Sequence, residues 1–135
     1  MARWFVFLVW TGFILYSMDI FIPAQSRVVG TIARLFVSLG LPAYTPAKVF
    51  HWGVFLVWSP LLAGALEGGY WRRFTGRNLR LCVYGLLLFG TLTEALQYFN
   101  PARTPALLDA GLNVLGGGTG LCLRRLAGSQ SEPRT

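Results

Sequence analysis

The chain has 135 residues, of which 54% are hydrophobic and 13% are charged, and its mean hydropathy is +0.53. A water-soluble domain of this length has too little interior to bury so many apolar side chains, which favours a membrane protein with one compact domain. The net charge is +7, but the arginines flank apolar runs instead of alternating with aromatic residues. This pattern argues against nucleic-acid binding and fits membrane topology and anionic lipid.

Four apolar runs approach the roughly 20 residues that a membrane-spanning helix needs. They cover residues 4–22, 49–66, 81–99 and 107–123. The segment after the first run, DIFIPAQS, is a poor signal-peptide cleavage site because bulky Ile22 and Pro23 would flank the cut, so we expect an uncleaved span. The expected fold is all-α: a four-helix membrane bundle that forms a single domain over residues 1–127, followed by a disordered cytoplasmic tail over residues 128–135.

Residues 25–40, between the first two runs, have a different pattern. Polar residues recur along one face and apolar residues along the other: Arg27, Thr31, Arg34 and Ser38 against Val28, Ile32, Leu35, Phe36 and Leu39. This is the period of a strongly amphipathic helix. We expect an outer helix that either lies in the membrane interface or packs on the outer end of the bundle.

The basic residues predict the orientation of the spans. With the N-terminus inside, eight of them fall on inner segments: Arg3, Arg72, Arg73, Arg77, Arg80, Arg124, Arg125 and Arg134. Four fall on outer segments: Arg27, Arg34, Lys48 and Arg103. Because lysine and arginine in short loops favour the cytoplasmic side, both termini are expected in the cytoplasm of a multi-pass protein.

This orientation brings a set of polar residues to the outer end of three spans and the loop between two of them. The set consists of Lys48, His51, Glu94, Gln97, Arg103, Asp109 and Asn113. Within each helix the members are three or four residues apart, so they share a face. With a rise of about 1.5 Å per residue, Glu94 lies roughly 7 Å inside its span. The set therefore occupies one level, in the outer third of the membrane.

Ionisable residues at such depth are costly and often mark function. One interpretation is a site for a polar or anionic head group, in which Lys48 and Arg103 meet phosphate or carboxylate. The other is a closed structural network in which these two cations pair with Glu94 and Asp109. Two cysteines and one histidine are too few for a zinc site of the usual kind, and no metal or other cofactor is expected.

Two pairs of glycines have the spacing that lets helices approach closely. They are Gly116-x-x-x-Gly120 in the fourth run and Gly64-x-x-x-Gly68 at the inner end of the second. Both are expected to serve packing between helices.

The polar positions resemble the VanZ-like family, small bacterial membrane proteins named after an accessory protein of teicoplanin resistance. The matching motifs are Lys48-x-x-His51, Glu94-x-x-Gln97, Asn100-Pro101-x-Arg103 and Asp109-x-x-x-Asn113-x-x-Gly116. The chain departs from the family at Ala47, where an acidic residue is frequent, and at Trp52, where phenylalanine is commoner. The resemblance implies an integral protein of the bacterial inner membrane and cell envelope, with a link to glycopeptide antibiotic resistance. It implies no particular reaction.

Three functions remain open at this point. The first is binding of membrane lipids, of an envelope lipid intermediate or of a lipoglycopeptide at the outer cluster. The second is an enzyme that modifies an envelope lipid, with His51 as the base and Glu94 or Asp109 as its orienting carboxylate. The third is a structural subunit with a membrane-protein partner. A transporter fits poorly, because four short spans without a repeat or a deep charge offer little for alternating access.

Overall fold

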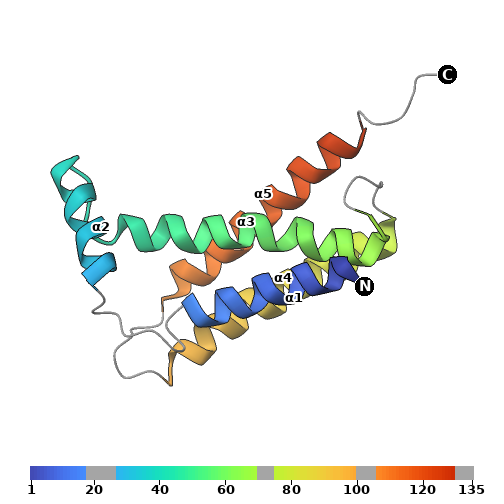
Figure 1. Ribbon diagram of the computed structural model, residues 1–135, viewed down its shortest axis with the longest axis horizontal. Helices are drawn as coiled ribbons and strands as arrows, with labels where there is room; N and C mark the ends of the chain where they lie inside the picture. The colour runs from blue at the N-terminus through green and yellow to red at the C-terminus, as the bar shows by residue number, and fades with distance from the viewer. Residues whose placement is uncertain (18–26, 70–74, 100–105, 130–135) are drawn as a thin grey trace.

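The computed structural model describes residues 1–17, 27–69, 75–99 and 106–129, and over these residues the chain is all-α, as predicted. The elements are α1 (Ala2–Leu15), α2 (Arg27–Ser38), α3 (Thr45–Glu67), α4 (Gly76–Gln97) and α5 (Leu107–Ser129). The four longer helices lie together, and α2 stands across one end of α3 (Figure 1). The start of α1 and the end of α5 both lie at the opposite end of the molecule.

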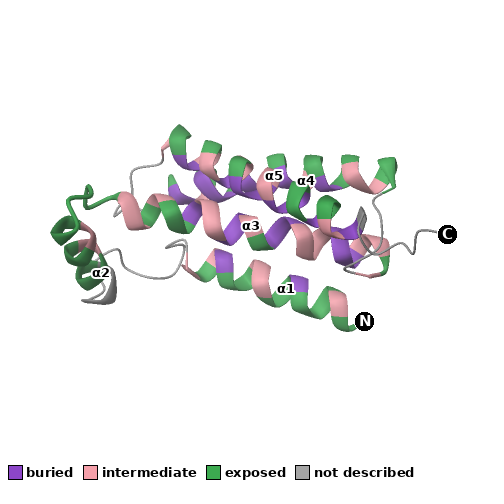
Figure 2. Cartoon of the chain, turned by 90° about the horizontal axis from the view of Figure 1, so that it is seen from above, coloured by how far each residue is buried: buried purple, intermediate pink, exposed green. Residues whose placement is uncertain are grey.

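Helix α3 is the centre of the fold. Its most extensive contact is with α5, and it also packs against α1 and α4. Figure 2 shows it between α1 on one side and the α4–α5 pair on the other, with the buried faces turned inward. The core between these helices is largely aromatic, since Phe55 and Trp58 are buried and Trp58 stacks on Phe89 with ring centroids 5.0 Å apart.

Two indole groups join α1 to α3. Trp10 Nε1 donates a hydrogen bond to the carbonyl oxygen of Val54 at 3.1 Å, and Trp58 Nε1 donates to Thr11 Oγ1 at 3.0 Å. A buried tryptophan normally finds an acceptor for its N–H group, and here each helix supplies one for the other. These reciprocal bonds fix the register of α1 along α3.

Glycines let the backbones of α3 and α5 approach each other closely. A Cβ atom at Gly116 would lie 2.0 Å from the carbonyl oxygen of Trp52, and one at Gly120 would lie 2.2 Å from that of Leu56. Pro60 has no N–H group to donate to the Leu56 carbonyl, so Gly120 covers a carbonyl that lacks its helical donor. The predicted packing role of these two glycines is confirmed.

Gly68, in the other predicted pair, does not act in this way. Gly68 lies just after α3 with φ +77°, in the left-handed region, and therefore terminates the helix. The prediction that Gly68 serves helix packing is wrong, because a glycine that follows the last turn of a helix is selected for its backbone conformation.

The described helices meet the predicted spans in part. Helices α3 and α4 are long enough and apolar enough to cross a membrane. Helix α1 is apolar but has only 14 residues, and residues 18–22 of the expected first span lie outside the described residues. Helix α5 continues to Ser129, beyond the predicted span end at residue 123, and Gly128 is buried within it. The tail boundary at residue 128 is therefore placed too early, and residues 130–135 lie outside the described part.

The predicted amphipathic helix is present as α2, and its apolar face is open. Ile32, Leu35 and Leu39 are 42%, 58% and 68% exposed. Packing on the end of the bundle would have covered these side chains, so these residues do not pack in that way.

Candidate functional site

Three helix ends meet at the end of the bundle where α2 lies (Figure 1): the start of α3, the end of α4 and the start of α5. Each contributes two members of the predicted polar set. We call them the polar cluster: Lys48, His51, Glu94, Gln97, Asp109 and Asn113. All of these except the half-buried Lys48 are at most 9% exposed. Arg103, the remaining predicted residue, lies outside the described residues.

An ion pair closes the outer side of the cluster. Lys48 Nζ donates to Asp109 Oδ1 at 2.5 Å, and the two side chains are 24% and 12% exposed. The pair links the first turn of α3 to the first turn of α5. Asp109 is also suited to its position at a helix N-terminus, where the helix dipole favours negative charge. One pairing of the predicted closed network is thus present.

Asn113 organises the interior of the cluster and is fully buried. Its Nδ2 donates to the carbonyl oxygen of Gly90 and to Thr93 Oγ1, both at 3.2 Å. Its Oδ1 must therefore accept, and it lies 3.1 Å from His51 Nδ1. This arrangement places a proton on Nδ1 of the imidazole and turns Nε2 toward Asp109, whose Oδ2 is 4.0 Å away.

Glu94 lies near the ion pair with its side chain only 8% exposed. Neither of its carboxylate oxygens makes a hydrogen bond of good geometry among the described residues, although the Ala106 backbone N–H and the Asn113 amide lie near it, and Oε1 lies 3.4 Å from His51 Nδ1. That imidazole proton is directed to the nearer Asn113 oxygen. A buried carboxylate whose donors are poorly placed costs free energy, because these donors replace its lost water only in part. The described cluster is therefore incomplete at Glu94.

Gln97 is 2% exposed and shares the buried face of α4 with Glu94. The same face carries two further residues, Gly90 and Thr93, which hold Asn113 in place. Sequence reasoning missed both, although residues 90, 93, 94 and 97 recur at helical spacing and belong to one stripe. That periodicity is the signal that would have found them.

The cluster also brings three metal-binding side chains together. One donor atom from each of His51, Glu94 and Asp109 lies within 4.8 Å of the other two. The sequence-based expectation of no metal site considered cysteine and histidine, whereas here carboxylates supply two of the three donors.

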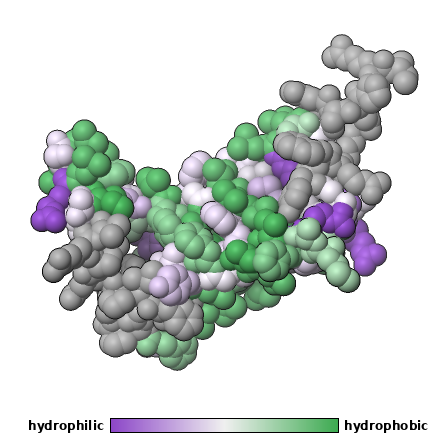
Figure 3. Space-filling view, viewed as in Figure 1, coloured by the Kyte–Doolittle hydropathy of each residue, from purple (hydrophilic) through white to green (hydrophobic). Residues whose placement is uncertain are grey.

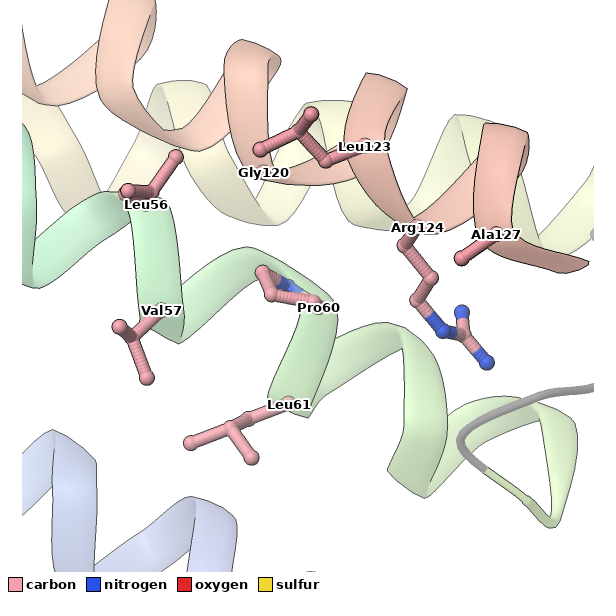
Figure 4. Close-up of a pocket in the computed structure, with 8 residues that line it drawn as sticks. All are labelled: Leu56, Val57, Pro60, Leu61, Gly120, Leu123, Arg124 and Ala127. Atoms are coloured by element: carbon pink, nitrogen blue, oxygen red, sulfur yellow. The ribbon is translucent and has the colours of Figure 1, made fainter.

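A separate groove of about 340 Å³ lies between α3 and α5 (Figure 4). Its lining is apolar except for Arg124, whose Nη2 donates to the carbonyl oxygen of Gly69 at 2.8 Å. The remaining lining residues are Leu56, Val57, Pro60, Leu61, Gly120, Leu123 and Ala127. A groove with this lining offers little to a polar ligand, so the polar cluster is the better candidate site.

No protein-family model, curated protein or solved structure matches this chain. The resemblance to the VanZ-like family therefore rests on the motif residues alone.

Proposed function

We propose that this protein is a VanZ-like, multi-pass protein of the bacterial cytoplasmic membrane that binds the polar head group of an envelope lipid or lipoglycopeptide at the polar cluster. In this proposal α1, α3, α4 and α5 are the four membrane-embedded helices, and both termini are cytoplasmic. The cluster then faces the outer leaflet. A role in glycopeptide resistance would follow if the head group belongs to a cell-wall intermediate.

The surface supports a membrane location. Large apolar side chains are exposed along each of the longer helices, among them Phe5 at 69%, Leu88 at 72% and Leu115 at 63%. Figure 3 shows hydrophobic residues across the middle of the visible face and strongly hydrophilic ones toward its two ends. A soluble monomer rarely exposes so much contiguous apolar surface.

The observation that carries the binding proposal is the buried Glu94 carboxylate, which makes no hydrogen bond of good geometry among the described residues. A head group with hydroxyl or amine groups would supply well-placed donors. The half-buried Lys48 lies near Glu94, and an ammonium group has three N–H donors, so it can serve both Asp109 and a phosphate oxygen. The open apolar face of α2 lies at the same end and would rest against the acyl chains.

Lipid retention tests this proposal. Native mass spectrometry of the detergent-purified protein should show a bound anionic or glycosylated lipid, and Lys48→Ala should reduce its retention roughly tenfold, the effect of losing one charge-assisted hydrogen bond. Arg80→Ala is the matched control, because Arg80 is an exposed cation near the opposite end of α4. Equal lipid retention by the two variants would contradict the proposal.

One observation favours a second candidate function, an enzyme that modifies an envelope lipid. His51 lies between two carboxylates, with Nδ1 3.4 Å from Glu94 and Nε2 4.0 Å from Asp109. A histidine in such a position can act as a general base on a hydroxyl group or water. If it does, His51→Ala cells will accumulate an unmodified lipid that wild-type cells convert. Identical lipid profiles would leave binding as the function.

A further inference from the structure

We propose that His51, Glu94 and Asp109 hold a divalent transition-metal ion of the zinc class. Each residue comes from a different helix of the three that build the polar cluster, and their donor atoms lie within 4.8 Å of one another. A tetrahedral zinc ion with bonds of about 2.0–2.2 Å holds its donor atoms roughly 3.3–3.6 Å apart. The three side chains therefore need to close by up to about 1.5 Å around the ion.

The donor types fit this class of ion. One imidazole nitrogen with two carboxylate oxygens suits zinc or manganese better than calcium or magnesium, which prefer oxygen alone. Three protein donors leave at least one coordination position for water or for a ligand oxygen, as in catalytic zinc sites.

The surroundings of the histidine are those of a metal ligand. A metal-bound histidine usually donates its second N–H group to an oxygen that fixes the orientation of the ring. Here His51 Nδ1 donates to Asn113 Oδ1 at 3.1 Å, and Asn113 is itself fixed by Gly90 and Thr93. The other nitrogen, Nε2, is turned toward Asp109.

Both carboxylates present an oxygen to the His51 ring, Glu94 Oε1 at 3.4 Å from Nδ1 and Asp109 Oδ2 at 4.0 Å from Nε2. Asp109 gives Oδ1 to Lys48 and turns Oδ2 toward His51. Glu94 is more than nine-tenths buried, and neither of its oxygens makes a hydrogen bond of good geometry among the described residues. A cation is the group that such a carboxylate lacks.

The ion would also change the net charge of the polar cluster from one that repels a phosphate to one that attracts it. If His51 is neutral and both carboxylates are ionised, the described side chains of Lys48, Glu94 and Asp109 give the cluster a net charge of minus one, which disfavours a phosphate. A divalent ion changes this to plus one. The ion would then bind an oxygen of the head group, a role that rests on the function proposed above, whereas the metal site itself does not.

Zinc titration of the purified, tag-free protein tests the site. After chelator treatment and dialysis, isothermal titration with zinc chloride should show one equivalent bound per chain, and Glu94→Gln should weaken this binding at least tenfold. Glu67→Gln is the matched control, because it makes the same chemical change at the far end of α3. Absence of stoichiometric binding to the wild type, or equal affinity in both variants, would overturn the proposal.

X-ray absorption on zinc-loaded wild-type protein provides a test that needs no variant. It should show nitrogen and oxygen ligands only. Sulfur ligands would place the zinc on Cys82 or the exposed Cys122 and would also overturn the proposal.

The metal-site proposal and the head-group proposal can be rejected independently of each other. Lipid retention that depends on Lys48 in a protein without zinc affinity would reject the ion alone. Stoichiometric zinc without retained lipid would reject only the head group.

Discussion

Gly116→Ala and Gly120→Ala should each destabilise the protein by about 3 kcal/mol, the upper end of the range for overpacked cores. The added Cβ would lie 2.0 Å from the Trp52 carbonyl oxygen in one variant and 2.2 Å from that of Leu56 in the other. These obstacles are backbone atoms in the middle of α3, which cannot rotate away as a side chain can. The helices must separate, and the separation pulls Asn113, three residues before Gly116, away from His51.

Thermal unfolding in detergent measures this effect, with Gly118→Ala as the matched control. A Cβ at Gly118 would meet nothing within 4 Å, and alanine is the better helix former by about 0.5–1 kcal/mol. The control should therefore melt at or above the wild-type temperature. Similar melting temperatures for all three variants would mean that α3 and α5 do not pack as described.

Glu94→Gln should raise the stability of the ligand-free protein while it impairs binding. The native carboxylate is buried without well-placed donors among the described residues, and replacing a charged group by a neutral amide removes most of that desolvation cost. We expect a gain of about 1–3 kcal/mol. The gain should disappear when the wild type is saturated with zinc or lipid, because the bound group stabilises only the wild type.

Melting of chelator-washed and zinc-loaded samples separates the two contributions. Glu67→Gln again serves as the control, since the amide oxygen that replaces the carboxylate can still accept from Thr75 N, now 2.8 Å from Glu67 Oε1. A loss of stability in ligand-free Glu94→Gln would show that the carboxylate has stabilising partners, and that the cluster is closed without a ligand.

Periodicity in the sequence is sufficient to predict the helices and the residues that share a face. Lys48 with His51, Glu94 with Gln97, and Asp109 with Asn113 follow from spacings of three and four, and the order of the helices brings the pairs to one end. The partner of each side chain does not follow, because it depends on how each helix is rotated about its axis. For this reason sequence reasoning allowed Lys48 either carboxylate, whereas the structure pairs it with Asp109.

The rotation of each helix and the path of the chain after it also explain why sequence patterns did not predict the roles of Gly90, Thr93 and Gly68. Thr93 and Gly90 become part of the cluster only because Asn113 meets α4 at their level. Gly68 has the spacing of a packing glycine, but its positive φ is a property of the chain path after Glu67 and has no signature in the spacing. Composition also placed the start of the C-terminal tail too early, at residue 128, because Gly128 is buried in the last turn of α5.

The reciprocal indole bonds between α1 and α3 have a consequence for the order of assembly. They join residues 44 and 47 positions apart, whereas the bonds of α3 to Asp109 and Asn113 join residues 61 and 62 apart. The contact between α1 and α3 can thus form once Trp58 has left the ribosome. At 5–20 residues per second, Asn113 follows on the order of 3–10 s later. During that interval Lys48 lacks Asp109 and His51 lacks Asn113. A chaperone or insertase that shields polar groups would act on this partly synthesised chain.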